Sequence, residues 1–325
     1  MNDSSNQVAR FFAMFRQMHL IRAFEHAAEV AWRDGLVAGS VHQYIGEEAI
    51  AVAVCANLKP ADYIASYHRG HGHSIAKGAS PARMMKELFG RAGGVCGGKG
   101  GSMHIADFSV GMLGANGVVG DGATIAVGAA HAIRLRREDR IVVAFVGDGA
   151  MNRGPFMEAL NWAQVFALPI LFVCEDNVYA STTRSANVTA GHPVERARSF
   201  GMSAETVDGN DIFAVDEIAA RLLGYVRGGK GPAFLHAATY RWYGHVTRDP
   251  GRYRDPEEVA RFMQRDPIKQ CAAWLCDHGV SSAELETARM ECETAIAGAV
   301  ADATAAPWPG LEAGYADVQD IGAPQ

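Results

Sequence analysis

The sequence predicts an α/β fold, with a mostly parallel sheet that carries helices on both faces. Two observations lead to this prediction. The stretch 141–184, IVVAFVGDGAMNRGPFMEALNWAQVFALPILFVCEDNVYASTTR, opens with six apolar residues and contains a second apolar run at 170–174. Such runs, rich in β-branched residues, are typical of buried parallel strands. Between them, residues 155–166 have the pattern of a helix, which the proline at 169 ends.

Composition and charge indicate a folded protein. Hydrophobic residues make up 49% of the 325-residue chain and charged residues 20%, a balance typical of globular domains. The net charge of −6 argues against a nucleic-acid-binding surface. The N-terminus lacks an apolar signal core, and no apolar run reaches the roughly 20 residues that a membrane helix needs. The six cysteines form no C-x-x-C pair, so we expect free thiols in a reducing cytoplasm.

Periodicity and capping residues place the other elements. We expect one domain over residues 1–325, opened by a helix at about 6–34 and closed by a helical region at about 256–305. Ser80, Asp211 and Ser281 or Ser282 precede predicted helices, where their side chains can accept free backbone N–H groups. Further helices are expected to begin near residue 47 and to span 81–89, 123–135, 194–200 and 212–227, with strands at 204–207 and 233–240.

The two strands of the 141–184 stretch end in oxygen-bearing side chains, in G-D-G at 147–149 and in E-D-N at 175–177. Parallel strands end at the same edge of a sheet, where ligands of open α/β sheets bind, so Asp148 and Asn177 can lie close together. Their oxygens, a nearby backbone carbonyl and a diphosphate suit an octahedral Mg²⁺. The alternative is two ordinary turns. G-D-G alone favours that alternative, but G-D-G, a helix and D-N in succession favour a metal site.

The segment 62–78, DYIASYHRGHGHSIAKG, brings three histidines and an arginine within six residues. A zinc site is one interpretation, but the cluster lacks cysteine and its spacing is not a familiar zinc pattern. An anion-binding loop fits better. The guanidinium of Arg69 can form paired hydrogen bonds with phosphate oxygens, and the glycines let the backbone approach a ligand closely.

Residues 90–122 are the most glycine-rich part of the chain. A flexible linker is one interpretation, but apolar residues such as Met103, Ile105 and Phe108 recur through the segment and indicate that it is packed. A second G-D-G stands at 120–122. We do not expect it to bind metal, because no apolar strand is predicted before it and Ala150 stands where an asparagine would be needed.

Together these motifs resemble a known family. G-D-G followed by a helix and D-N is similar to the signature of enzymes that bind thiamine diphosphate (ThDP). The strings VHQYIGEEA, GKGGSMH, GANGVVG, GDGAMNRGPFMEALNWA, LPILFVCEDNVYASTT and RWYGH resemble the α subunits of the E1 components of the 2-oxo acid and acetoin dehydrogenase complexes. The resemblance extends over residues 10–305. It implies a ThDP-binding fold in which this chain forms the diphosphate-binding domain.

The resemblance implies roles for residues of the central stretch. Asp148, Asn177 and the main-chain carbonyl of Tyr179 would bind Mg²⁺, and Gly149 and Ala150 would lie against the diphosphate of ThDP. The cofactor would act as the electron sink for cleavage of a C–C bond, while the protein binds and orients it.

Three positions depart from the family pattern. Asp176 stands where the family usually has Asn, so it adds negative charge beside the expected cation. Arg153 stands where an acidic or amide residue is usual. Val246 occupies the place at which some family members carry a regulatory phosphoserine, so that switch is absent there.

Residues before the central stretch would contact the cofactor. By resemblance, Arg69 binds the diphosphate, with His68 beside it at a position where some family members have Tyr. Gly117 and Val119 touch the cofactor, and Val119 supports its bent shape. Lys99, Ser102 and His104 are expected only to order the glycine-rich segment.

Three histidines are expected to face the reaction. By resemblance, Arg241 and His245 reach the terminal phosphate and the substrate, His42 faces the reactive ring of the cofactor, and His71 faces the active-site channel. His42, His71 and His245 are therefore candidates to donate and accept protons, since an unperturbed imidazole titrates near neutral pH.

We expect this chain to carry only half of an active site. ThDP enzymes usually activate the cofactor with a glutamate from a second domain that binds its pyrimidine, and this chain has no room for a second domain of similar size. The resemblance implies that an E1 β subunit supplies it in an α₂β₂ heterotetramer. It also implies a small carbonyl substrate, whose acyl unit passes to a lipoyl-bearing E2 partner.

Several functions remain open at the level of sequence. The strings YHRGHGHSIAKG and TYRWYGH favour acetoin as the substrate, and pyruvate or a branched-chain 2-oxo acid is the alternative. One half of a split transketolase, which moves ketol units without lipoate, is a second hypothesis. A non-catalytic subunit that binds the cofactor is a third, for which Asp121 and Asp176 are the supporting departures.

Overall fold

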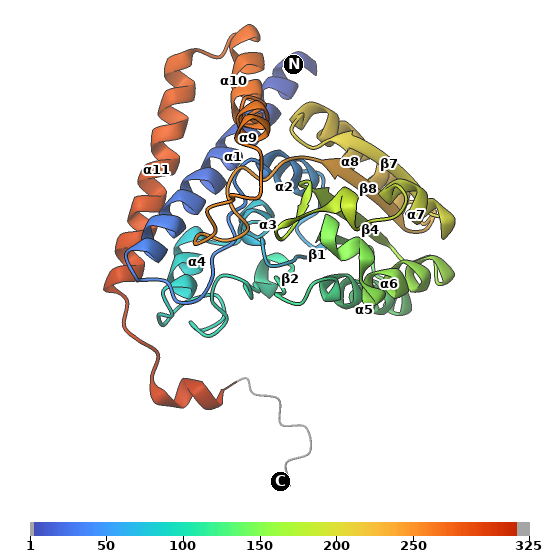
Figure 1. Ribbon diagram of the computed structural model, residues 1–325, viewed down its shortest axis with the longest axis horizontal. Helices are drawn as coiled ribbons and strands as arrows, with labels where there is room; N and C mark the ends of the chain where they lie inside the picture. The colour runs from blue at the N-terminus through green and yellow to red at the C-terminus, as the bar shows by residue number, and fades with distance from the viewer. Residues whose placement is uncertain (1–2, 317–325) are drawn as a thin grey trace.

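The centre of the computed structural model, which describes residues 3–316, is a sheet of six parallel strands (Figure 1). The strands lie in the order β2-β1-β3-β4-β8-β7, and each pairs in parallel with its neighbours. The predicted α/β fold with a mostly parallel sheet is confirmed. The strands are β1 Tyr63–Ala65, β2 Met112–Gly114, β3 Val142–Gly147, β4 Ile170–Asp176, β7 Ser203–Asp208 and β8 Ala233–Ala238.

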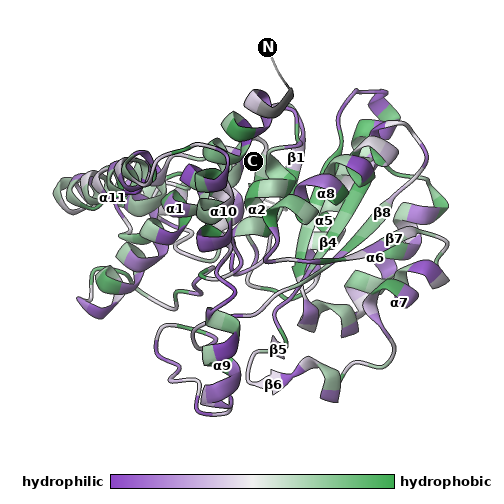
Figure 2. Ribbon diagram, turned by 90° about the horizontal axis from the view of Figure 1, so that it is seen from above, coloured by the Kyte–Doolittle hydropathy of each residue, from purple (hydrophilic) through white to green (hydrophobic). Residues whose placement is uncertain are grey.

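Helices cover both faces of this sheet, as the side chains of β3 show. Val143 and Phe145 pack into one hydrophobic core, and Val142 and Ala144 pack into another on the opposite face, as the alternation of side chains along a strand requires. Figure 2 shows the apolar strands between helical layers. The helices are α2 Glu48–Cys55, α3 His71–Lys77 and α8 Ile212–Arg227 on the first face, and α5 Asp121–Arg136, α6 Gly154–Val165 and α7 Pro193–Ser199 on the second.

The central strand–helix–strand unit matches its prediction closely as β3, α6 and β4. The second strand is longer than expected, because β4 pairs on both sides. Its residues up to Glu175 pair with β3, and Asp176 still pairs with Ala238 of β8. Glu175 and Asp176 therefore belong to the strand, and only Asn177 lies in the turn that follows it.

The remaining helices form a layer beside the sheet. The predicted N-caps are present: the side chains of Ser80, Asp211 and Ser281 each accept a backbone N–H of the following helix. Helix α11 packs against α1 and α4. These helices are α1 Asp3–Arg33, α4 Pro81–Leu88, α9 Pro256–Met263, α10 Pro267–Asp277 and α11 Ser282–Ala305.

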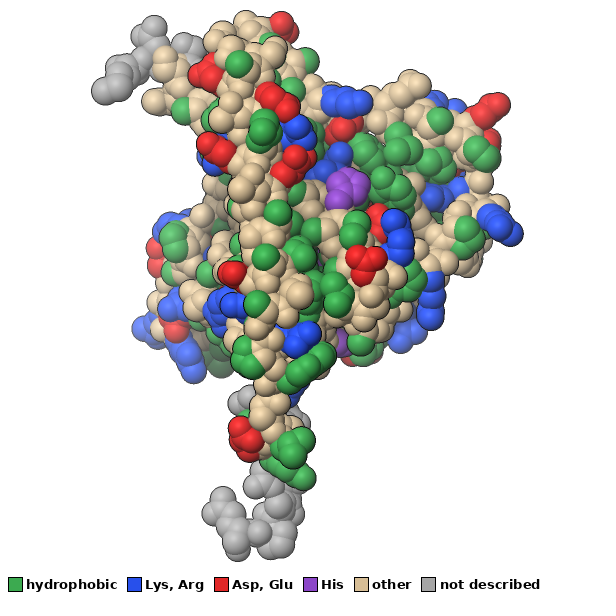
Figure 3. All heavy atoms as spheres, turned by 90° about the vertical axis from the view of Figure 1, so that its left-hand side faces the viewer, with side chains coloured by type: hydrophobic (Ala, Val, Ile, Leu, Met, Phe, Trp, Pro, Cys, Tyr) green, Lys and Arg blue, Asp and Glu red, His purple; other side chains and the backbone are tan. Residues whose placement is uncertain are grey.

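The face over α11, which lies at the left of Figure 1, mixes charges of both signs with apolar side chains (Figure 3). Arg16 pairs with Glu291 at 2.5 Å, and Arg289 pairs with Glu286 at 2.5 Å. Within residues 3–316, no helix is both long and apolar enough to cross a membrane.

Three segments differ from the sequence-based expectation. The stretch 62–78 is not one loop, because β1 precedes the arginine and α3 follows it; three residues are too few to show a strand period. The short strand β2 does precede the second G-D-G, so the expectation that none does is wrong, and Asp121 opens α5. Beyond Asn177 the chain forms a small antiparallel hairpin of β5 Tyr179–Ala180 and β6 Thr183–Arg184.

The glycine-rich segment is packed, and a single carboxylate organises it. The side chain of Glu87 is fully buried and accepts hydrogen bonds from the backbone N–H groups of Cys96 at 2.8 Å, Gly98 at 2.8 Å, Gly100 at 2.7 Å and Gly101 at 3.2 Å. Glu87 thus provides the hydrogen-bond acceptors that these backbone N–H groups would otherwise find in a helix or a sheet.

Replacing Glu87 by alanine should therefore destabilise the protein strongly. Four part-buried donors would lose a carboxylate acceptor, and hydrogen bonds to charged groups are worth about 1.5–3 kcal/mol each. We therefore expect the free energy of unfolding to fall by about 3 kcal/mol or more. Urea denaturation measures this change. The control, Glu286→Ala on the exposed face of α11, should stay within about 0.5 kcal/mol of the wild type; equal losses in both variants would contradict the assignment.

Candidate active site

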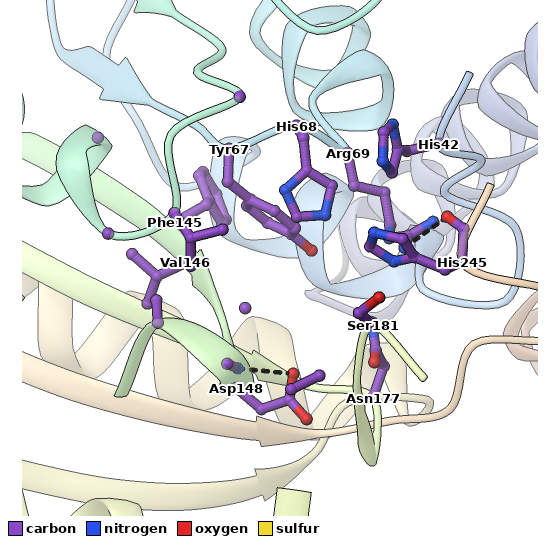
Figure 4. A pocket seen from close by; sticks show the side chains of 18 of the residues that line it. His42, Tyr67, His68, Arg69, Phe145, Val146, Asp148, Asn177, Ser181 and His245 are labelled. Atoms are coloured by element: carbon purple, nitrogen blue, oxygen red, sulfur yellow. Dashed lines mark hydrogen bonds between the residues drawn. The ribbon is translucent and has the colours of Figure 1, made fainter. Parts of the chain in front are cut away.

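A cavity of about 500 Å³ lies at the carboxyl edge of the sheet (Figure 4). The chain leaves β1 toward β2 on one side and leaves β3 toward β4 on the other, which creates a crevice where parallel sheets bind their ligands. All residues predicted for the site except His71 line this cavity. They are His42, His68, Arg69, Gly117, Val119, Asp148, Gly149, Ala150, Asn177, Tyr179, Arg241 and His245.

Asp148 supplies a buried carboxylate to the cavity at the end of β3. Its Oδ1 accepts the N–H of Gly149 at 2.9 Å, and its Oδ2 accepts the hydroxyl of Ser185. Burial raises the pKa of Asp148 to about 6, although the hydrogen bond from Ser185 opposes the shift. These two donors fix the orientation of the carboxylate.

Asn177 and Tyr179 bring two further oxygens to the cavity from the turn after β4. The Nδ2 of Asn177 donates to both carboxylate oxygens of Glu47, at 3.2 and 3.3 Å. Its Oδ1 accepts the N–H of Tyr179 at 3.4 Å and keeps a second lone pair for a ligand. The carbonyl of Tyr179 accepts an N–H from Arg241 at 3.3 Å and keeps a second lone pair. Asp148, Asn177 and Tyr179 all line the same cavity.

The other end of the cavity is cationic. Arg69 and Arg241 are only 1% and 2% exposed. Arg241 donates to uncharged acceptors, including the carbonyl of Ser181 at 2.9 Å and the hydroxyl of Tyr253 at 2.6 Å. Burial, and then the charge of Arg69, lower the pKa of Arg241 to about 10. In Figure 4, Arg69 and the neighbouring histidines lie opposite Asp148.

These two ends fit a ligand that carries a diphosphate and a divalent cation. A buried charge is costly unless an opposite charge or a hydrogen-bond partner compensates it. The Nδ1 of His42 is buried without a hydrogen-bond partner, so the cavity wall has an unused polar atom that can contact a ligand. Asp148 and Asn177 provide the hard oxygens that Mg²⁺ prefers.

Comparison with known proteins shows the family. Residues 16–312 match the family model of the dehydrogenase E1 component. The chain belongs to the dehydrogenase E1 component family. Membership of this family implies dependence on ThDP.

Three relatives illustrate the range of this E1 family. The chain is 45% identical over 308 residues to the α subunit of acetoin:2,6-dichlorophenolindophenol oxidoreductase from Cupriavidus necator, with 94% of this chain and 92% of that one covered. It is 45% identical over 258 residues to the α subunit of the same name from Bacillus subtilis, which covers 79% and 78%. It is 37% identical over 307 residues to the pyruvate dehydrogenase E1 component α subunit of Rhizobium meliloti, which covers 94% and 88%.

Three imidazoles of the E1 chain gather at the cationic end of its cavity. The ring centroids of His42 and His68 are 4.6 Å apart, and those of His42 and His245 are 4.8 Å apart. Burial lowers the pKa of His245 to about 4, with Arg69 and Arg241 acting in the same direction. Burial and neighbouring positive charge also hold the pKa values of His42 and His68 well below the usual range. All three rings are therefore neutral at neutral pH.

We expect none of these three rings to gain a proton between pH 8 and about pH 5 in the cofactor-free protein. The sign follows from the lowered pKa values: burial and the guanidinium groups disfavour imidazolium, so protonation requires a pH near or below 4. Histidine ring NMR can follow the titration, with Gln substitutions to assign each signal. A midpoint near the ordinary value of about 6.5 for any of the three would contradict this electrostatic picture.

His71 lies behind the cavity wall, contrary to the expectation that it faces the channel. Its Nδ1 is 3.0 Å from Glu25 of α1, and its Nε2 is 2.9 Å from the hydroxyl of Ser102. His73 is also turned inward, with Nδ1 at 2.8 Å from Ser66. Because α3 points these side chains away from His68, the three do not form a zinc site. His71 instead joins α1 to the glycine-rich segment.

Small and apolar residues shape the remaining wall. A Cβ on Gly149 would lie 3.0 Å from the Cβ of Ala180, so a larger residue at 149 would press on the hairpin. Gly117 and Val119 line the cavity from the glycine-rich segment, and Val119 is 38% exposed, so its apolar side chain is free to contact a ligand. Ala150 follows Gly149 in the same short turn.

The departure at Asp176 has a structural partner. Its Oδ2 lies 3.0 Å from the Nε2 of His236 on β8, and its Oδ1 accepts the N–H of Val178 at 3.1 Å. Burial opposes ionisation, but the hydrogen bond and charge of His236 outweigh it and hold the pKa of Asp176 below its usual range. The extra negative charge is thus compensated beside β4. Arg153, the other departure, lines the cavity.

Sequence reasoning missed several residues of the site. Tyr67 and Met103 line the cavity. Tyr67 stands just after β1, so recognising that short strand would have identified it. Glu175 lies beneath the cavity and accepts the hydroxyl of Tyr67 at 2.6 Å. In the sequence, only the position of Glu175 in the E-D-N motif pointed to the site. The motif gave no indication that Glu175 would contact Tyr67.

Proposed function

We propose that this chain is the α subunit of a ThDP- and Mg²⁺-dependent E1 dehydrogenase that cleaves acetoin and transfers the acetyl unit to a lipoyl-bearing E2. The observation that carries the proposal is the cavity at the sheet edge, where the buried cations Arg69 and Arg241 face the oxygens of Asp148 and Asn177. Family membership supports the same conclusion.

Each end of the cavity has a distinct task in this proposal. Asp148, Asn177 and the carbonyl of Tyr179 hold Mg²⁺, while Gly149 and Ala150 leave space for the diphosphate. Arg69 and Arg241 neutralise the phosphate charges. Bound ThDP supplies the electron sink for C–C bond cleavage.

The neutral imidazoles act on the substrate. His42 and His245 line the cavity and are uncharged near neutral pH, so each can donate one hydrogen bond and accept another. We assign them to orienting the carbonyl substrate by hydrogen bonds to its oxygen. His68 lines the cavity next to Arg69.

The assignment of acetoin rests on similarity. Two relatives named as acetoin:2,6-dichlorophenolindophenol oxidoreductase α subunits share 45% identity with this chain, against 37% for a pyruvate dehydrogenase E1 α subunit. Pyruvate and branched-chain 2-oxo acids are the alternative substrates. We also propose a cytoplasmic location, which the free cysteines support.

A β subunit completes the enzyme in this proposal. The relatives are named as α subunits, which supports a heterotetramer of the α₂β₂ type. The partner would supply the glutamate that activates ThDP, and the active site would lie between the two chains.

The test is a comparison of substrates with the assembled enzyme. The chain is purified together with its β subunit and is supplied with ThDP and Mg²⁺. Reduction of 2,6-dichlorophenolindophenol or of lipoamide is then measured with acetoin, pyruvate and branched-chain 2-oxo acids. We expect the highest kcat/KM with acetoin. A higher value with a 2-oxo acid would overturn the substrate, and no reduction with any of them would overturn the oxidoreductase.

A further inference from the structure

One buried carboxylate connects the two ends of the cavity without lining it. Glu47 has no exposed surface and directly precedes α2. Its oxygens accept the amide of Asn177 at 3.2 and 3.3 Å, and Oε1 lies 3.7 Å from the Nε of Arg69. Glu47 thus contacts one residue assigned to the metal and one assigned to the diphosphate.

The contact with Asn177 decides which end of an amide faces the cavity. An asparagine side chain offers an oxygen at one end and two N–H donors at the other. A carboxyl oxygen of Glu47 accepts the N–H end. The oxygen end accepts the N–H of Tyr179 at 3.4 Å and keeps a lone pair for a cation. A glutamate keeps an acceptor oxygen whether or not it carries a proton, so this orientation does not depend on the charge of Glu47.

The contact with Arg69 places a carboxyl group behind a buried cation, although burial raises the pKa of Glu47 to about 8. The Nη atoms of Arg69 donate to the carbonyls of Gln43 and His245, whereas its Nε has no hydrogen-bond partner. Glu47 is the carboxylate that forms an ion pair with this guanidinium. Its oxygen lies beside the guanidinium and holds the group at the cavity wall.

Glu47 is not needed to cap the helix that it precedes. Its side chain makes no capping hydrogen bond to α2. The neighbouring Glu48 stabilises the start of α2 instead. It accepts the N–H of Gly46 at 2.9 Å and pairs with Arg22. The buried side chain of Glu47 is directed at the site instead.

We propose that Glu47 is a positioning residue that presents the Asn177 oxygen to Mg²⁺ and Arg69 to the diphosphate, and so couples the binding of the metal to that of the cofactor. This inference rests on the proposed Mg²⁺–ThDP site. Because the same carboxylate holds both residues, its loss weakens each ligand and the mutual support between them. Residues that hydrogen-bond a metal ligand without touching the metal typically change the metal affinity by about 10- to 100-fold.

The test measures cofactor binding rather than turnover. Isothermal titration of the assembled α/β enzyme gives the Kd of ThDP over a range of Mg²⁺ concentrations for the wild type, Glu47→Ala, Glu47→Gln and Glu48→Gln. We expect Glu47→Ala to raise the half-saturating Mg²⁺ concentration by about 10- to 100-fold. Glu47→Gln, which keeps an acceptor for Asn177, should stay close to the wild type in this Mg²⁺ dependence.

The control separates positioning from folding. Glu48→Gln should lower Tm without changing the Mg²⁺ dependence. Unchanged binding in Glu47→Ala overturns the proposal, as does a loss that parallels Tm in the variants of both glutamates. If Glu47→Ala does not assemble, Glu47→Asp decides: its shorter side chain should raise the Mg²⁺ requirement, and wild-type behaviour overturns the proposal. A wild type that binds no Mg²⁺–ThDP refutes the proposed function itself.

Discussion

Replacing Asp148 by alanine is expected to abolish Mg²⁺-dependent ThDP binding and, with it, dye reduction in the presence of acetoin. Mg²⁺ sites with bound phosphates usually contain one or two protein carboxylates, and Asp148 is the carboxylate among the three proposed ligands. The loss of affinity should exceed the 10- to 100-fold that is typical for partners outside the ligand set. Titration calorimetry and the dye-linked assay measure the two effects separately.

The chain contains a matched control for this change. Asp121 also stands between two glycines, but it opens α5 and does not line the cavity, although Gly120 and Gly122 do. Asp121→Ala should leave ThDP binding and activity near those of the wild type. Retention of Mg²⁺-dependent binding by Asp148→Ala, or equal losses in the two variants, would contradict the metal assignment.

Replacing Arg69 by alanine should have the second largest effect. The variant removes a buried cation, and each hydrogen bond that Arg69 would make to a phosphate oxygen is worth about 1.5–3 kcal/mol. We expect the Kd of ThDP to rise by about 10- to 100-fold or more at saturating Mg²⁺. Calorimetry of the assembled enzyme measures this rise.

Lysine should not restore the affinity, because an ammonium group cannot reproduce the planar pair of donors of a guanidinium. Arg221→Ala is the matched control, since Arg221 lies on the exposed face of α8 and pairs with Glu205. It should bind ThDP as the wild type does. An Arg69→Lys variant with wild-type affinity would show that charge alone is required there.

The parts of the fold that follow from local pattern could be predicted. The unit β3–α6–β4 has long apolar strands and a terminated helix, and its ends place Asp148 and Asn177 at one edge. The N-caps Asp211 and Ser281 could likewise be predicted from the sequence, because an N-cap depends only on residues within one helical turn. Strands of three residues, such as β1, leave no measurable period.

The support of the site could not be predicted, because it depends on contacts between distant residues. Glu47 and Asn177 are 130 positions apart in the chain, and nothing near Glu47 distinguishes it from an acid at the start of a helix. His71 is the opposite case, a residue that was predicted to face the channel and does not line the cavity. Its sequence context placed it with His68, yet the short helix α3 turns it toward Glu25, where it supports the wall.

A crystal structure of the assembled enzyme grown with Mg²⁺ and ThDP tests the central claim most directly. The account predicts the cation against Asp148, Asn177 and the carbonyl of Tyr179, and the diphosphate between this cation and Arg69. A cofactor bound elsewhere, or a cation that touches neither Asp148 nor Asn177, would contradict it.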